Sequence, residues 1–374
     1  MKNIHYLLIA SLIALTFIWG CAQPKSNTTD KNPINLNLKN CKIEDQREFN
    51  DIFNVDFVPL ETNDRCLIGE IFKVCYANDK IVVLDRNKSK QIFLLDKNGK
   101  FINLVGKTGG GPKEYNSPND ISILDDKIYV LSPDKAIQIY TLEEGNYLKT
   151  IMLKELPGEA FEMVSNKKFI SNGIGYNTIK FWDIKNNIGE VTNAISDSLG
   201  KAFSPGPNIF SNNGKYYYRE VFADTIYEIS PERLIPKITL GSPIKKINFK
   251  NPMEYLKAFN KEIENTPHLL GYAFMDDYWL CGVNITDASF KNTSFLVVEN
   301  LNTQDVCSVK NSCFDGICTK DICGSFKNGI ILQQSSDEVL SSMKKHPEIK
   351  YPEKLMEIKE TDNSVLLMIT VKKK

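Results

Sequence analysis

Histidine is scarce in this sequence, and neither sign of charge is in excess. Three of the 374 residues are histidine, and 46 Lys and Arg residues balance 46 Asp and Glu residues, which gives a formal net charge of zero. A chain without surplus cations has little to neutralise a phosphate backbone. We therefore expect no nucleic-acid partner.

Motifs of hydrolytic enzymes are missing as well. Neither H-E-x-x-H nor G-x-S-x-G occurs, and a Ser-His-Asp triad would have to recruit His268 or His346, which both stand beside a proline at an expected helix end. A histidine at a helix C-terminus usually complements the helix dipole or faces solvent. We predict no catalytic residue, and the absence of a nucleophile–base pair weighs against an enzyme without excluding one.

Long apolar runs are absent beyond the N-terminus. Residues 6–19 are almost continuously apolar and follow a single lysine, Lys2. The run is too short to span a bilayer and has the length of a signal-peptide core. The sequence predicts a signal peptide over residues 1–20 and hence an exported protein.

The end of this run predicts a lipid anchor. Gly20-Cys21 resembles the bacterial lipobox, in which a cysteine after a small residue is acylated and becomes the new N-terminus. We expect lipid attachment at Cys21, and two or more acyl chains hold a protein firmly on a membrane. Ala22 replaces the aspartate that retains lipoproteins at the inner membrane of many bacteria, which favours the outer membrane. A plain secretory signal with a chance cysteine is the alternative. Residues 21–33 are polar and predict a flexible tether, which leaves residues 34–374 as one domain.

Nine cysteines occur, and four of them fall close together near the C-terminus. Three interpretations are open for these four cysteines in an exported protein. They are reduced packing residues, which we slightly favour, or two of them form a local disulfide such as Cys313 with Cys318, or they form a metal site. The spacing matches zinc motifs only in part, so we expect no metal. The four are Cys307, Cys313, Cys318 and Cys323, and we expect Cys41, Cys66, Cys75 and Cys281 to be packing residues or unpaired thiols.

A repeat of short strands decides the architecture. The segment 81–85 returns after 47 residues as 128–132, and each copy is followed by a second strand and a turn. Repeats of 40–50 residues made of short strands are typical of propeller blades. We predict an all-β, six-bladed β-propeller with repeats opening at Ile81, Ile128, Phe169, Tyr216, Tyr278 and Ile330.

Two insertions and one closing strand complete this prediction. Residues 252–265 and a segment from the capping box at Ser335 to about Lys345 carry helix signals, which predicts two short helical insertions. A ring of blades needs its open edges sealed. We expect residues 56–61 to add the outer strand of the last blade beside residues 364–371.

A glycine-rich loop separates the first two repeats. No Gly-Lys-Ser/Thr follows the glycines, so a phosphate site is not supported. We expect a loop that crosses between blades, with glycine permitting positive φ. Its residues are Gly109, Gly110, Gly111, Pro112, Glu114 and Tyr115.

This loop resembles NHL-type propeller repeats. The combination of Cys21, residues 57–62, residues 109–115 and residues 362–367 is similar to six-bladed propeller lipoproteins found in many copies in Bacteroides-like bacteria. The resemblance is sharp from about residue 56 to residue 142. It implies a six-bladed fold and a periplasmic or surface location, and it implies no activity.

Carboxylates and aromatic residues leave two functions open. We expect Asp85 and Asp96 to form turns. Asp120, Asp276 and Asp277 are candidates for the blade starts where some propeller enzymes hold calcium in the central channel, but for Asp276-Asp277 we favour an ordinary tight turn. The aromatic residues fill space between blades or form a sugar-stacking platform. They are Trp182, Tyr216, Tyr217, Tyr218, Tyr278 and Trp279.

The predicted function follows from these patterns. We expect a membrane-anchored exported lipoprotein that binds or scaffolds a glycan, peptide or protein partner. The alternative is a calcium-assisted hydrolase or lyase with its site in the central channel. We expect no other cofactor.

Overall fold

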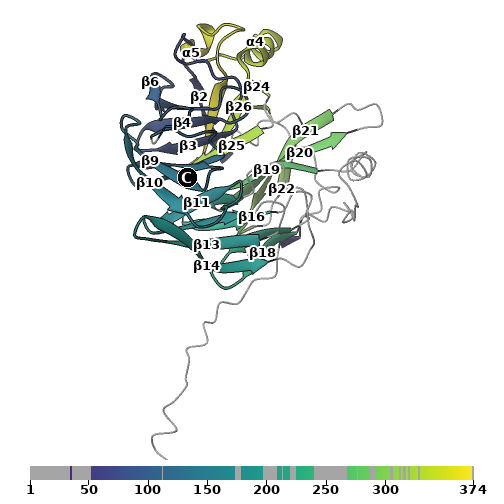
Figure 1. The fold of residues 1–374 in the computed structure, drawn as a ribbon. Helices are drawn as coiled ribbons and strands as arrows, with labels where there is room; N and C mark the ends of the chain where they lie inside the picture. Colours follow the sequence, from purple (N-terminus) through teal and green to yellow (C-terminus); the bar gives the residue numbers. More distant parts are fainter. Residues whose placement is uncertain are drawn as a thin grey trace, which may run out of the picture. The chain divides into compact units, whose positions relative to one another are not determined.

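Short strands dominate the computed structural model (Figure 1). It describes residues 34–35, 52–111, 113–172, 178–196, 209–212, 214–219, 225–239, 268–275, 277–286, 292–303, 306–310, 313–314, 317–318, 321–326 and 329–372. The predicted signal peptide, Cys21, the tether, Pro112 and the helix expected over residues 252–265 lie outside the described residues.

The described strands form six antiparallel units of four strands each. Unit one holds β3 (Lys73–Ala77), β4 (Lys80–Asp85), β5 (Gln91–Asp96) and β6 (Phe101–Leu104). Unit two holds β7 (Asp120–Leu124), β8 (Lys127–Ser132), β9 (Ala136–Thr141) and β10 (Tyr147–Leu153). Unit three holds β11 (Phe161–Ser165), β12 (Lys168–Asn172), β13 (Thr178–Lys185) and β14 (Ile188–Ser196).

The second half of the chain continues the pattern. Unit four holds β15 (Ile209–Asn212), β16 (Lys215–Tyr218), β17 (Thr225–Ile229) and β18 (Leu234–Thr239), and β1 (Ile34–Asn35) pairs in parallel with β18. Unit five holds β19 (His268–Met275), β20 (Tyr278–Thr286), β21 (Asn292–Asn300) and β22 (Val306–Lys310). Unit six holds β25 (Asp321–Phe326), β26 (Gly329–Gln334), β27 (Val365–Val371) and β2 (Phe53–Pro59). A small hairpin of β23 (Cys313–Phe314) and β24 (Ile317–Cys318) precedes unit six.

The all-β prediction is confirmed. Each predicted repeat start lies in the second strand of a different unit, so the repeat spacing finds every unit but misses its first strand. Parallel pairing of β10 with β14 also joins units two and three into one eight-stranded sheet. Parallel pairing of β25 with β3 joins units six and one into another.

Strand β4 shows why the apolar runs are continuous rather than alternating. Ile81 and Val83 pack into a cluster shared with unit six, whereas Val82 and Leu84 pack into a cluster shared with unit two. Successive side chains of a strand point to opposite faces, so a strand between two neighbours is buried on both.

The same arrangement repeats through the chain. Six buried apolar clusters lie between units one and two, two and three, three and four, four and five, five and six, and six and one. The order of contacts is therefore cyclic, although the units are successive in the sequence.

The cycle is completed by strands from opposite ends of the described chain. As predicted, β2 pairs antiparallel with β27, from Phe53 opposite Val371 to Pro59 opposite Val365. Strand β2 is the last strand of its sheet, where the missing N–H of Pro59 is harmless.

A single asparagine fixes the loop beside this pairing. Asn363 donates from Nδ2 to the carbonyl oxygens of Glu61 (2.6 Å) and Cys66 (2.8 Å), and its Oδ1 accepts from the N–H of Ile68 (2.9 Å). Its backbone N–H donates to Thr62 Oγ1 (2.7 Å). A buried amide with all these partners holds the segment after β2 against the segment before β27.

Two α-helices occur among the described residues, α4 (Ser336–Lys345) and α5 (Glu353–Met356). The predicted N-cap of α4, Ser335, is confirmed, but its hydroxyl bonds the Glu338 carboxylate (3.0 Å) instead of a backbone N–H. Val339 and Leu355 attach the helices to the cluster between units five and six. No helix within the described part of the chain is long and apolar enough to cross a membrane.

Candidate functional site

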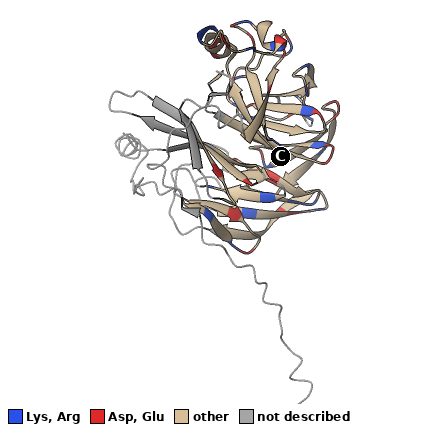
Figure 2. Cartoon of the chain, turned by 180° about the vertical axis from the view of Figure 1, so that it is seen from behind, with Lys and Arg blue, Asp and Glu red and all other residues tan. Residues whose placement is uncertain are grey.

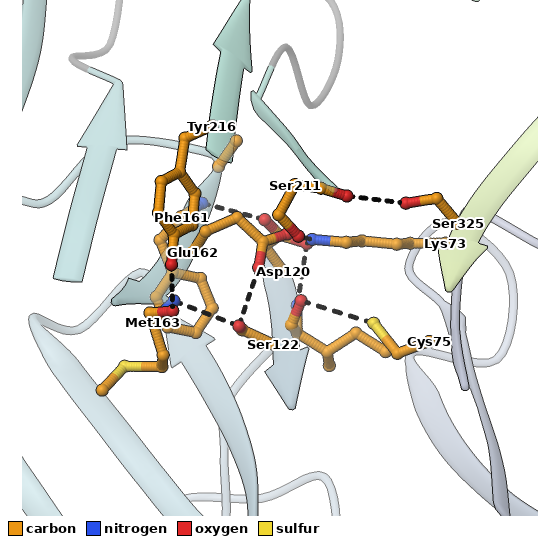
Figure 3. A network of polar contacts seen from close by, with 12 residues as sticks. Lys73, Cys75, Asp120, Ser122, Phe161, Glu162, Met163, Ser211, Tyr216 and Ser325 are labelled. Atoms are coloured by element: carbon orange, nitrogen blue, oxygen red, sulfur yellow. Dashed lines mark hydrogen bonds and ion pairs between the residues drawn. The ribbon is translucent and has the colours of Figure 1, made fainter. Parts of the chain in front are cut away.

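Three charged side chains meet where the first strands of units one, two and three come together (Figure 3). Lys73 opens β3, Asp120 opens β7, and Glu162 is the second residue of β11. Lys73 Nζ lies 2.9 Å from Asp120 Oδ1 and 2.9 Å from Glu162 Oε1. One ammonium group therefore bridges carboxylates from two other units.

The remaining carboxylate oxygens also have partners. Asp120 Oδ2 accepts from the Phe161 N–H (2.9 Å), and Glu162 Oε2 accepts from Ser122 Oγ (2.8 Å). Ser122 Oγ in turn accepts from the Met163 N–H (3.1 Å). Strands β7 and β11 are thus joined by side chains rather than by a β ladder, and every carboxylate oxygen of the cluster is used within the chain (Figure 3).

The cluster is buried, and this sets its protonation. The Asp120 side chain has 0% exposure, Lys73 12% and Glu162 11%. Burial alone lowers the pKa of Lys73, but the carboxylates of Asp120 and Glu162 outweigh it, and the pKa of Lys73 is raised. Burial raises the pKa of Glu162, against the opposing effect of Lys73. Lys73 is therefore a firmly charged ammonium and a poor nucleophile.

Cys75 lies beside this cluster without becoming reactive. Burial, opposed by Lys73 and reinforced by Glu162 and Asp120, raises the pKa of the Cys75 thiol to about 12. Since the thiolate is the nucleophilic form, this thiol is inert near neutral pH.

Two further polar contacts join units in the same region (Figure 3). Ser325 Oγ on β25 donates to the carbonyl oxygen of Ser211 on β15 (3.0 Å), which links the first strands of units six and four. The Tyr216 hydroxyl on β16 donates to the carbonyl oxygen of Met163 on β11 (3.2 Å), so both side chains bond the backbone of another unit.

Of the carboxylates considered for calcium, Asp120 belongs to the charged cluster, where Lys73 already neutralises it. Asp277 lies in the exposed turn between β19 and β20, and Asp276 lies outside the described residues. Within the described ranges, no group of three or more His, Cys, Asp and Glu side chains is placed to hold a metal ion. Asp85 and Asp96 form turns as expected, since Asp85 accepts from the N–H groups of Lys88 and Ser89, and Asp96 from those of Asn98 and Lys100.

The glycine loop lies between β6 and β7, and so between units one and two. The Gly109 N–H donates to the Tyr115 carbonyl oxygen (2.9 Å), and the Glu114 carboxylate accepts from the Gly111 N–H (2.9 Å). The Tyr115 side chain is buried in the cluster between the two units, and its hydroxyl donates to the Val105 carbonyl oxygen (2.9 Å).

The expected positive φ occurs at one glycine of this stretch. Gly106 has a φ of 68°, whereas Gly109, Gly110 and Gly111 do not have positive φ. A Cβ at Gly109 would lie 2.1 Å from the Glu114 carboxylate and one at Gly111 would lie 2.9 Å from it, but nothing lies within 4 Å of a Cβ at Gly110. Two of the three glycines therefore make room for a side chain of their own loop.

Most of the aromatic residues considered for sugar stacking are buried between units. Trp182 is stacked on Phe169 with ring centroids 5.1 Å apart and donates from Nε1 to Ser171 Oγ (2.8 Å). Tyr217 is stacked on Phe274. Trp182, Tyr217, Tyr218 and Trp279 are buried, and Tyr216 and Tyr278 are half-buried. The space-filling interpretation holds for the four buried rings.

The structure places several of the cysteines and both histidines considered in the sequence. Cys66, Cys281 and Cys323 are buried, Cys75 is half-buried, and none of these four described cysteines is in a disulfide. Cys313 and Cys318 are opposite residues of β23 and β24. His346 ends α4 as expected, but His268 is the first residue of β19 and not a helix end.

Sequence reasoning missed Lys73, Ser122 and Glu162. A usable signal existed, because Lys73 and Asp120 are separated by the same 47 residues as Ile81 and Ile128. A charged residue at the same point of two successive repeats predicts two charges on neighbouring first strands.

Comparisons with solved structures support the fold. A crystal structure of a candidate exported protein from Bacteroides fragilis NCTC 9343 matches with a TM-score of 0.66 and 15% identity, over 91% of this chain and 99% of that chain. At this identity the likeness concerns the fold alone. The designed Ika8 protein (TM-score 0.38, 12% identity, 75% of this chain and 71% of that chain) and the RRP9 WD40 repeats (0.46, 9%, 85% and 98%) are too distant to add to the argument.

No curated protein matches the sequence. A family model described as "Domain of unknown function (DUF4934)" matches residues 33–370, which is nearly all of the chain and the whole of its six strand units. The chain therefore belongs to the DUF4934 family.

Proposed function

We propose that this protein is an exported, lipid-anchored six-bladed β-propeller that binds or scaffolds a glycan, peptide or protein. The propeller is supported by the six four-strand units, the cyclic order of their apolar clusters and the pairing of β2 with β27. Propellers avoid open sheet edges through such radial repetition.

The observation that carries the binding function is the state of the Lys73–Asp120–Glu162 cluster. It is the concentration of charge that an enzyme would use, yet each group is neutralised or hydrogen-bonded by its neighbours. General acid–base or nucleophilic catalysis needs a group with a free lone pair or proton within reach of substrate. The cluster instead fastens three units together, which leaves the outer surface for recognition.

Residues of both charges are mixed along the described chain. Figure 2 shows Lys and Arg interspersed with Asp and Glu over the described strands. This pattern, together with the net charge of zero, supports a partner other than nucleic acid.

Export and anchoring rest on the N-terminal sequence. The apolar run and Gly20-Cys21 match a lipoprotein signal, and the Bacteroides fragilis protein with the same fold is a candidate exported protein. Acylation at Cys21 would hold the strand units at a membrane through residues 21–33.

Affinity capture tests both parts of the proposal. The tagged wild-type protein and Cys21→Ser are expressed in the bacterium that encodes the protein, and the cells are labelled with a palmitate analogue. The proteins and carbohydrates recovered with each form are then identified. We expect label and membrane association only for the wild type, and specific recovery of one protein or one glycan. Equal labelling of Cys21→Ser and the wild type contradicts the anchor. The binding function is contradicted if the wild type recovers no protein or glycan that an unrelated lipoprotein, captured in the same way, does not also recover.

A further inference from the structure

A carboxyl group is buried on the apolar face between units four and five. Glu299 of β21 has 2% exposure, and its Oε2 has no hydrogen-bond partner. It lies opposite Trp279 of β20, so the two side chains share one face of the sheet. Trp279 belongs to the apolar cluster between units four and five, and its Nε1 is likewise buried without a partner.

The face around Glu299 offers little to compensate a negative charge. Tyr272, Phe274, Trp279 and Val297 form it on unit five, and Tyr217, Ile226 and Ile238 face them from unit four. The Tyr272 hydroxyl and Asn212 Oδ1 are also buried and unbonded. An ionised carboxylate that is buried without a partner is strongly disfavoured, whereas the neutral acid is tolerated.

Several other titratable groups occur among the described residues of the two units. Glu228 of unit four is paired with Lys237 (3.1 Å) and Lys215 (3.9 Å). Burial raises the pKa of Tyr272 and of Tyr217, with opposition from Arg219 at Tyr272 and reinforcement from Glu228 at Tyr217, so both hydroxyls stay neutral. Asp277 is exposed in the β19–β20 turn, and Cys281 is a buried thiol.

We propose that Glu299 makes the interface between units four and five responsive to protons, tight while the carboxyl is protonated and looser once it ionises. Burial raises the pKa of Glu299 from its ordinary 4.5 to about 7. A group whose pKa is raised in the closed state favours closure at low pH, and that advantage is lost as pH rises through the raised value. The advantage is complete below the ordinary value of 4.5 and is lost as pH rises to about 7, so the upper end of this range lies near neutral pH.

The size of the effect follows from the two pKa values. If Glu299 becomes solvated when the interface opens, the opening equilibrium constant rises roughly tenfold between about pH 6 and about pH 8. Strands β4–β6 of unit one carry no buried carboxyl oxygen without a hydrogen-bond partner and serve as an internal reference.

Hydrogen exchange followed by mass spectrometry tests this in the full chain. Peptides covering β19–β21 are compared with peptides covering β4–β6 at both pH values, after correction for the intrinsic exchange rate. We expect protection of β19–β21 to fall about tenfold from pH 6 to pH 8 in the wild type. Glu299→Gln, which keeps the shape and cannot ionise, abolishes this pH response, and Glu228→Gln retains it.

A second variant and a second measurement keep the test decisive if Glu299→Gln does not fold. Glu299→Met also removes the titration if the glutamine variant does not fold. In the wild type, the infrared C=O band of a protonated carboxyl should disappear between pH 6 and pH 8 and be missing from either Glu299 variant. A wild type with equal protection at both pH values, or a Glu299 variant that keeps the response, overturns the proposal.

Discussion

Removing the ammonium group of Lys73 is the most informative perturbation of this fold. Lys73→Met keeps most of the unbranched side chain but leaves the carboxylates of Asp120 and Glu162 facing each other without a cation. Both carboxylates are almost fully buried, so water replaces the lost partner poorly.

The expected loss of stability is large because the substitution leaves two buried carboxylates without their cation. Breaking a buried ion pair by removing one partner destabilises a protein by about 3–5 kcal/mol. Asp120 retains the N–H groups of Ile121 and Phe161, and Glu162 retains Ser122, which places the expected loss near the lower end, about 3 kcal/mol. Lys97→Met provides a matched control, because Lys97 pairs with Asp79 at the surface (3.0 Å) and its removal should change stability far less.

Urea denaturation followed by circular dichroism measures the difference. Lys73→Met should lower the free energy of unfolding strongly at neutral pH, and adding Asp120→Asn and Glu162→Gln should recover much of it, because no buried charge then remains. Since Lys73 opposes the raised pKa of Glu162, the variant should regain stability as pH falls and Glu162 takes up a proton. A loss no larger than that of Lys97→Met, or no recovery in the triple variant, would refute the role assigned to the cluster.

Three further outcomes follow from the structure. Gly109→Ala should lower the free energy of unfolding by about 1–3 kcal/mol in thermal or urea melts, because its Cβ displaces the Glu114 carboxylate from the Gly111 N–H, whereas Gly110→Ala should change it little; equal effects would contradict this account of the loop. Asn363→Asp should lower it by about 2–4 kcal/mol, because a carboxylate oxygen then faces the carbonyl oxygens that accepted from Nδ2; a neutral effect in the same melts would rule out the proposed fastening. Chelation of calcium should leave the melting temperature of purified protein unchanged, and a clear decrease would revive the calcium-assisted enzyme.

The strands and their closure could be predicted from the sequence because they rest on local patterns. The apolar run Ile81–Leu84 must be buried on both faces, and its return at Ile128 reports a second copy of the same packing. The pairing of β2 with β27 is predicted because the exposed edge of the last sheet needs a partner strand, although the sequence does not give the register of that pairing.

The charged cluster was harder to predict, because it joins residues of three units. Lys73 and Glu162 are 89 residues apart, and neither belongs to a motif. In units one to three the first strand begins seven residues before the second, so its position follows from the repeat, but the spacing does not show which of its side chains meet. The role of Gly109 escaped for a similar reason, since only the conformation of Glu114 shows that a Cβ would collide with it.

The pairing of the two chain ends is the claim on which the proposed six-bladed ring depends most, and a disulfide across it tests that claim most directly. Asn54 lies opposite Thr370, and neither side chain is fully buried. The account predicts that Asn54→Cys with Thr370→Cys forms a crosslink on mild oxidation, detected by peptide mapping, and that it raises the melting temperature. The pair Asn54→Cys with Val371→Cys, shifted by one residue to the opposite face, should not crosslink. Efficient crosslinking of the shifted pair, or none of the matched pair, would contradict the closure.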